Sequence, residues 1–112
     1  MQLIASFTAQ DGSEAAVRDL LTAYAAVVRS QEGTVLFEPS TSVEQPNEFV
    51  VFERYRDESA FRAHVGSAEN TTFNERLAPL IRSDVALRFL RPLRDARARV
   101  SQLMVGISGS AR

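Results

Sequence analysis

Residues 48–64 constrain the fold more than any other part of the chain, because a strand pattern passes directly into a helix pattern there. The strand, from Glu48 to Arg56, carries apolar side chains on both of its faces. Asp57 follows the strand and is a suitable N-cap for a helix that begins at Glu58. The only histidine of the chain, His64, lies on that helix. The stretch therefore predicts a strand followed directly by a helix, and this strand–helix unit includes the only histidine of the chain.

Three further elements are predicted before this unit. Alternating side chains indicate a first strand from Leu3 to Thr8, and Asp11 or Ser13 is expected to cap a helix after it. That helix is predicted from an apolar stripe and is expected to end near Gly33. Its stripe consists of Val17, Leu20, Leu21, Tyr24, Val27 and Val28. A second strand from Thr34 to Ser42 then forms a hairpin with the strand that begins at Glu48.

The helix that begins at Glu58 is expected to break near Gly66, and its second piece is expected to kink or end at Pro79. A fourth strand is predicted from Val85 to Leu93. The order strand, helix, strand, strand, helix, strand is typical of the α+β ferredoxin-like fold, βαββαβ, with a four-stranded antiparallel sheet and its helices on one face. We assign this domain to residues 1–93.

The side-chain pattern of the strands predicts that two copies of the chain associate. Phe49 and Val51 point to one face, whereas Val50 and Phe52 point to the other. Helices cover only one face, so the apolar side chains of the second face need another cover. The same face of a second subunit is the simplest cover, and we expect a homodimer whose sheets pack face to face.

Composition excludes several classes of protein. The net charge of −1 argues against a nucleic-acid partner, and no apolar run is long enough to cross a membrane. There is no cysteine, which suits a cytoplasmic location. The thirteen basic residues are all arginine, and several of them crowd residues 94–112. We predict that this segment is an arginine-rich C-terminal extension, partly ordered or in contact with the dimer partner.

No metal site and no cofactor are predicted. A single histidine without cysteine is a poor ligand set for a metal ion, and no glycine-rich phosphate loop is present. Three side chains of the strand–helix unit remain as candidates for chemistry. Glu53 and Tyr55 share one strand face with Phe49, and His64 lies on one helix side with Phe61. If these surfaces meet, Glu53, Tyr55 and His64 border one cavity, where a histidine can exchange a proton.

Other interpretations of these residues stand beside the catalytic one. A lone histidine near a helix end is more often a capping, surface or packing residue, and Tyr55 is more often an aromatic wall of the core than a proton donor. Phe61 and Phe73 fit a core stripe that also lines an apolar pocket, and Phe52 is a further candidate wall.

The strand from Phe49 to Arg56 and the helix after it resemble the antibiotic biosynthesis monooxygenase family. The usual pattern of that family is a strand ending in Glu-x-Trp, a few polar residues, an apolar pair and then Ala-His. Here Glu53 matches the glutamate, Tyr55 takes the place of the tryptophan, and His64 matches the histidine. The resemblance covers roughly residues 2–93 and implies a dimeric α+β barrel.

Members of this family include cofactor-independent monooxygenases that oxidise quinols or polycyclic aromatic phenols with molecular oxygen. The resemblance implies such a reaction for a quinol or a similar aromatic, with His64 and Tyr55 handling protons or holding the substrate oxygen and Glu53 orienting one of them. Haem degradation is disfavoured, because the haem-ligating histidine of the relatives that degrade haem falls near Leu77. The alternatives are an isomerase or lyase of the same fold and a non-catalytic dimer that binds a small molecule.

Overall fold

The computed structural model describes residues 1–93; the predicted extension, residues 94–112, lies outside the described residues. The elements follow the predicted order. They are β1 (Gln2–Thr8), α1 (Glu14–Arg29), β2 (Thr34–Thr41), β3 (Glu48–Tyr55), α2 (Glu58–Val65), α3 (Ala68–Leu77), a short 3₁₀ turn (Ala78–Leu80) and β4 (Ala86–Leu90). The strands form one antiparallel sheet in the order β2-β3-β1-β4, which confirms the ferredoxin-like α+β fold.

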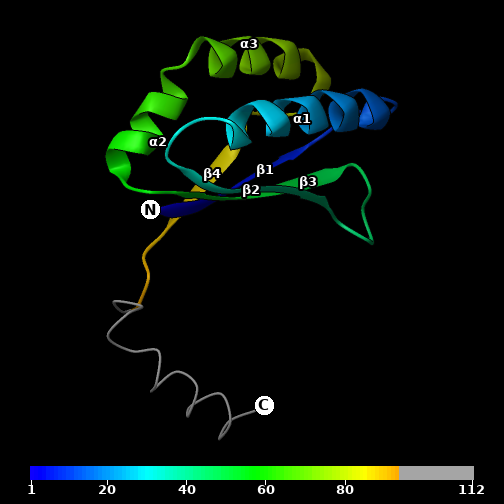
Figure 1. Ribbon diagram of the computed structural model, residues 1–112. Coiled ribbons are helices and arrows are strands. Elements are labelled where there is room, and N and C mark those ends of the chain that lie inside the picture. The colour runs from blue at the N-terminus through cyan, green and yellow to red at the C-terminus, as the bar shows by residue number, and fades with distance from the viewer. Residues whose placement is uncertain (94–112) are drawn as a thin grey trace, which may run out of the picture.

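All three α-helices lie on one side of the sheet, and α3 runs along α1 (Figure 1). The predicted break in the second helical region is confirmed, because α2 ends at Val65 and α3 begins at Ala68. Ser67 makes the break, since its hydroxyl accepts a hydrogen bond from the Asn70 N–H at 3.1 Å and donates one to the His64 carbonyl at 2.7 Å. The break divides the helical cover into two separately oriented pieces.

Two predicted helix ends are also confirmed. The Asp57 carboxylate caps α2 by accepting a hydrogen bond from the Ala60 N–H at 2.8 Å. The α3 helix ends at Leu77, and Pro79 lies in the 3₁₀ turn that follows, where its missing N–H removes no α-helical hydrogen bond.

Three predicted boundaries are wrong. No side chain caps α1, because Asp11 pairs with Arg82 instead and Ser13 makes no side-chain cap hydrogen bond. The helix ends at Arg29, four residues before Gly33. The fourth strand does not span Val85 to Leu93, because its pairing partner β1 begins at Gln2, which lies opposite Leu90.

Gly33 has a different task from the one predicted. Its φ of +93° lies in the left-handed region, and a Cβ atom built there would lie 2.6 Å from the Cβ of Ala60. Its carbonyl also accepts a hydrogen bond from the Arg56 N–H at 2.7 Å. The glycine thus lets the connection between α1 and β2 pack closely against the first turn of α2.

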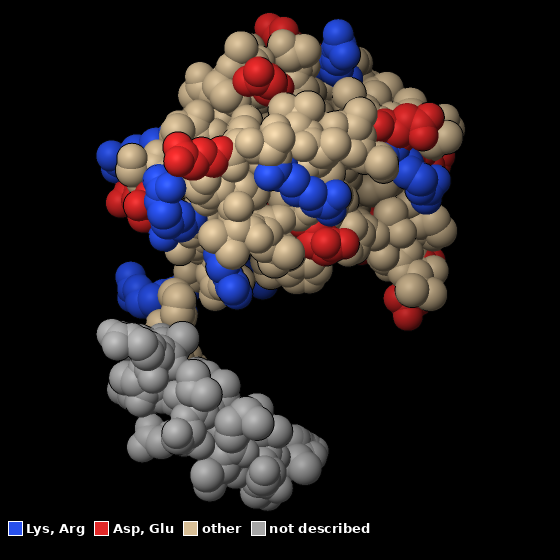
Figure 2. All heavy atoms as spheres, in the orientation of Figure 1, with Lys and Arg blue, Asp and Glu red and all other residues tan. Residues whose placement is uncertain are grey.

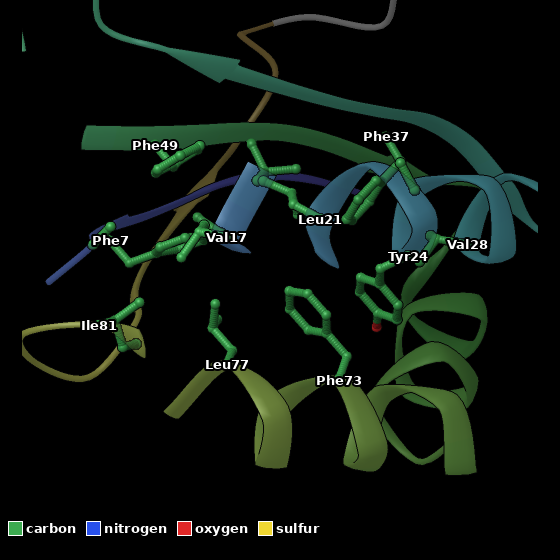
Figure 3. Close-up of a cluster of buried hydrophobic side chains, with 14 residues drawn as sticks. Phe7, Val17, Leu21, Tyr24, Val28, Phe37, Phe49, Phe73, Leu77 and Ile81 are labelled. Atoms are coloured by element: carbon green, nitrogen blue, oxygen red, sulfur yellow. The ribbon is translucent and has the colours of Figure 1, made fainter. Parts of the chain in front are cut away.

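The core fills the space between the helices and the sheet (Figure 3). At one end the rings of Phe7 and Phe49 stack with centroids 5.6 Å apart, and Val17, Leu77 and Ile81 surround them. Each of these five side chains is buried, so this end of the sheet is closed by apolar packing.

Within residues 1–93, no helix lies over the opposite face of the sheet (Figure 1). Leu36, Phe52 and Leu90 expose 38%, 43% and 39% of their surface there, and Ile4 and Val50 are half-buried. This confirms that apolar side chains occupy both faces of the strands. On the surface seen in Figure 2, acidic and basic side chains alternate without a single-sign patch. No helix within residues 1–93 is long and apolar enough to cross a membrane.

Candidate functional site

A cavity of about 220 Å³ lies between the helices and the sheet, beside the closed core. Its walls come from all four strands or their flanking residues and from all three α-helices. The lining side chains are Leu3, Ala5, Phe7, Leu21, Tyr24, Phe37, Val51, Glu53, Phe61, His64, Val65, Asn70, Phe73, Asn74, Val85 and Leu87. Most are apolar, and few polar groups converge on the space, which is typical of a small-molecule site.

Glu53 is the acidic residue of the cavity. It projects from the helix-facing side of β3 and is only 8% exposed. The Tyr55 hydroxyl donates a hydrogen bond of 2.6 Å to its Oε1 atom. Burial raises the pKa of Glu53, and this hydrogen bond only partly opposes the rise. The carboxyl group is therefore easier to protonate than an ordinary glutamate and can serve as a hydrogen-bond donor when protonated.

His64 is the basic residue of the cavity. Its Nδ1 atom lies 2.9 Å from Oε1 of Gln31, in the connection between α1 and β2. The amide oxygen of Gln31 can only accept a hydrogen bond, so Nδ1 is the donor in this contact. The hydrogen of the neutral ring therefore lies on Nδ1, and Nε2 is left as the acceptor. Burial lowers the pKa of His64. The ring is thus kept neutral near pH 7, in the form that accepts a proton.

Tyr55 contacts both of these residues from outside the cavity. Its ring stacks on His64 with centroids 5.1 Å apart, while its hydroxyl reaches Glu53. It is 1% exposed and does not line the cavity. Burial, together with the hydrogen bond to Glu53 and the charge of Glu53, raises the pKa of Tyr55, so the phenol remains protonated.

An aromatic wall closes the cavity toward α1 and α3. The rings of Tyr24 and Phe73 are stacked, with centroids 3.9 Å apart and planes at 5° (Figure 3). The Tyr24 hydroxyl donates a hydrogen bond of 2.9 Å to Oδ1 of Asn70, and the Asn70 amide donates one to the Val65 carbonyl. Burial raises the pKa of Tyr24, so this phenol also stays protonated.

The structure brings together most of the residues that the sequence singled out. Glu53, His64, Phe61 and Phe73 line one cavity, and Tyr55 contacts two of them. Phe52 does not belong to this group. Side chains alternate along a strand, so Phe52 points to the uncovered face while Glu53 points to the helices.

Three residues of the site were missed by the sequence reasoning. Tyr24 was assigned to a core stripe, although a phenol on an otherwise aliphatic helix face signals a hydroxyl that needs a partner. Gln31 and Asn70 gave no signal, because their roles depend on contacts across 33 and 46 residues of sequence. Within residues 1–93, no three His, Cys, Asp or Glu side chains gather in an arrangement suited to a metal ion.

Comparison with known proteins places the chain in a family. Residues 1–76 match the family profile described as "Antibiotic biosynthesis monooxygenase". A protein of Mycobacterium tuberculosis named "Putative monooxygenase Rv0793" is 31% identical over 96 residues, which cover 86% of this chain and 94% of that protein. The chain therefore belongs to the antibiotic biosynthesis monooxygenase family, as the strand–helix pattern predicted.

Solved structures agree with this assignment. The structure of Rv0793 superimposes with a TM-score of 0.78 at 30% identity, over 85% of this chain and 96% of that one. PA3566 of Pseudomonas aeruginosa gives a TM-score of 0.76 at 25% identity, over 83% of this chain and 93% of that one. A protein of Nitrosomonas europaea described as "Putative antibiotic biosynthesis monooxygenase" gives 0.79 at 18% identity, over 84% and 100%, and at that identity supports the fold alone.

Proposed function

We propose that this chain is a monooxygenase that needs no cofactor and oxidises a quinol or a similar hydroxylated aromatic with molecular oxygen. The observation that carries the proposal is the pairing of a neutral buried histidine with an apolar cavity of about 220 Å³. A hydroxylated ring fits such walls, and deprotonation by His64 makes the ring itself a reductant. Membership of the family and the name of the Mycobacterium tuberculosis relative support the same reaction class.

In the proposed reaction His64 removes the proton of one substrate hydroxyl through Nε2. The electron-rich ring then transfers an electron to O₂, and the two radicals combine to form a carbon–oxygen bond. His64 returns its proton to the distal oxygen, the O–O bond breaks, and this oxygen leaves as water with the hydrogen lost from the ring carbon. One quinol and one O₂ thus give one hydroxyquinone and one water, so atoms and electrons balance.

The neighbours of His64 receive distinct roles. Gln31 holds the tautomer that leaves Nε2 as the proton acceptor. Glu53 binds the substrate oxygen or its developing charge from the sheet side, favoured by the protonated form that burial stabilises. Tyr55 positions both residues without touching the substrate, which reverses the roles that the sequence suggested for Tyr55 and Glu53.

The test is oxygen uptake with a panel of quinols, followed by mass spectrometry of the product formed under ¹⁸O₂. The proposal predicts one labelled oxygen in the product and one in water, with uptake strongly reduced in His64→Ala. Unchanged uptake in that variant would remove His64 from the mechanism. Conversion of a substrate without oxygen would assign the site to an isomerase or lyase, and binding without conversion would assign it to a non-catalytic protein.

We also propose that two copies of the chain associate through the uncovered face of the sheet. The support is the exposed apolar side chains of Leu36, Phe52 and Leu90 on that face. Light scattering coupled to size-exclusion chromatography is expected to give twice the chain mass, and Phe52→Glu is expected to shift the protein toward the monomer. A monomeric wild-type protein would contradict this assembly.

A further inference from the structure

The charge of the cavity limits what it can bind. Glu53 is its one acidic side chain and His64 its one basic side chain, and none of the arginines within residues 1–93 lines it. An anionic ligand would lie beside an acidic residue and a neutral histidine without a cation to pair with. Burial of an unpaired charge is strongly unfavourable, so the lining selects an uncharged molecule.

Glu53 and His64 lie together at one end of the cavity, since Tyr55 contacts both of them. Along the paired strands Glu53 lies opposite Leu3, Val51 lies opposite Ala5, and Phe49 lies opposite Phe7. The end at Glu53 therefore lies four residues along the strands from the apolar end, where Phe7 also borders the cavity. A ligand with a hydroxyl group at one end and a hydrocarbon ring at the other matches this gradient.

Ala5 is the small residue between these ends. It is 5% exposed and forms part of the cavity floor, while its strand neighbours on the same face are the much larger Leu3 and Phe7. On the neighbouring strand β4, Leu87 lies opposite Ala5 and is 51% exposed, so the cavity opens to solvent on this side. The missing side-chain volume at Ala5 lets a flat ring lie on the sheet.

The volume sets a size limit. An engineered apolar cavity of about 150 Å³ accommodates benzene, so scaling by carbon number gives about 250 Å³ for two fused rings and about 350 Å³ for three. The cavity of about 220 Å³ matches two fused rings with a slight overhang at the mouth beside Leu87. It is too small for three.

We infer that Ala5 sets the substrate range of this site, which takes an uncharged hydroxyaromatic of one or two rings with its hydroxyl group at the Glu53–His64 end. This inference rests on the proposed assignment of the cavity as the active site and narrows its substrate. Rings of three or more and molecules with an anionic substituent are excluded.

The first experiment measures equilibrium binding by calorimetry, with probes that do not require turnover: phenol, 2-naphthol, 2-anthrol and the anion of 6-hydroxy-2-naphthoate. We expect 2-naphthol to bind about tenfold more tightly than phenol, because one extra apolar group in a fitted pocket gives an effect of that order. The naphthoate is expected to bind about 100-fold more weakly than 2-naphthol or not at all. Equal binding of the naphthoate, or equal or tighter binding of 2-anthrol, would overturn the inference.

The second experiment replaces Ala5 with Leu, and with Val as a smaller step in case the larger side chain prevents folding. Ala26→Leu on the exposed side of α1 is the matched control. We expect Ala5→Leu to weaken 2-naphthol binding by about tenfold or more while phenol binding changes by less than about threefold, with Val between wild type and Leu. An equal loss of affinity for both ligands, or no loss for either, would show that Ala5 does not set the substrate range.

Binding and oxygen uptake separate the two proposals. The predicted order of affinities without any oxygen uptake leaves the substrate range intact and refutes the monooxygenase reaction. Oxygen uptake with quinols of three rings as fast as with those of two rings supports the reaction and refutes the size limit.

Discussion

The helix-facing side of one sheet is closed at one end and hollow at the other. At the closed end Phe7 and Phe49 stack and buried aliphatic side chains fill the space above them. At the hollow end the strands present Glu53 and Ala5, and the cover comes from α2 and α3, which are divided at Gly66 and Ser67. A cavity forms where a small floor residue coincides with a broken helical cover, because neither side then supplies enough volume to fill the space.

The largest effect on stability is expected at the closed end. Phe49→Ala removes a ring that is 2% exposed and stacked on Phe7. We expect a loss of about 3–5 kcal/mol in the free energy of unfolding, measured by urea denaturation. Val43→Ala, at a residue 93% exposed, is the control and is expected to change stability by less than about 0.5 kcal/mol. A loss below about 1 kcal/mol for Phe49→Ala would mean that this end is not closely packed.

The largest effect on activity is expected at the hollow end. His64→Gln removes the proposed proton acceptor, and kcat should fall by about 10²–10⁴-fold. Arg62→Gln, on the exposed surface of the same helix, is the control and should retain wild-type activity. Because burial lowers the pKa of His64, the wild-type rate should be constant near neutral pH and fall only below 6.5, the ordinary value for histidine. A rate that already begins to fall above pH 7 as the pH is lowered would contradict a buried neutral ring.

Glu53 should reduce stability at neutral pH, unlike the apolar side chains of the closed end. Its folded-state pKa is raised, so the folded protein binds the proton more tightly, and this contribution to stability is lost as pH rises from 4.5 through the folded-state value. Glu53→Gln has no ionisable group at this position, so its stability does not decline through this titration. The stability of the wild type relative to the variant should therefore decline by about 1.4 kcal/mol for each unit of pKa elevation. Denaturation of both proteins between pH 4 and 8 measures it, and a constant difference would contradict the raised pKa.

A smaller effect is expected from Tyr55→Phe, which removes the hydrogen bond to Glu53 and keeps the ring that stacks on His64. We expect a loss of about 0.5–1.5 kcal/mol in the free energy of unfolding. Without the donor, the pKa of Glu53 should rise further, so the decline in stability with pH should extend to higher pH than in the wild type. An unaltered pH dependence would show that the Tyr55 hydroxyl does not act on Glu53.

The fold was largely predictable because its signals are local. The cap at Asp57, the break at Gly66 and the apolar alternation of the strands each depend on a few neighbouring residues. The same alternation places Glu53 on the helix-facing side of β3, where it borders one cavity with His64 of α2, and places Phe52 on the other side. The strand period and the helix caps were therefore enough to predict the fold and to bring Glu53 and His64 together as candidate site residues.

The parts that could not be predicted depend on contacts between distant segments. The hydrogen bonds of His64 to Gln31 and of Tyr24 to Asn70 join residues far apart in the sequence. The end of β4 at Leu90 depends on where β1 begins, and the role of Gly33 depends on how closely Ala60 approaches. Such features arise from three-dimensional packing, for which the sequence carries no short-range pattern.

The most direct test of the hollow end as the ligand site is methyl NMR of the protein titrated with 2-naphthol. The largest chemical-shift changes are predicted for Ala5, Leu21 and Leu87, which line the cavity. Ile81 at the closed end and Ile4 on the uncovered face of the sheet should remain unshifted. Largest changes at Ile4 or Ile81, with Ala5 unaffected, would contradict the account.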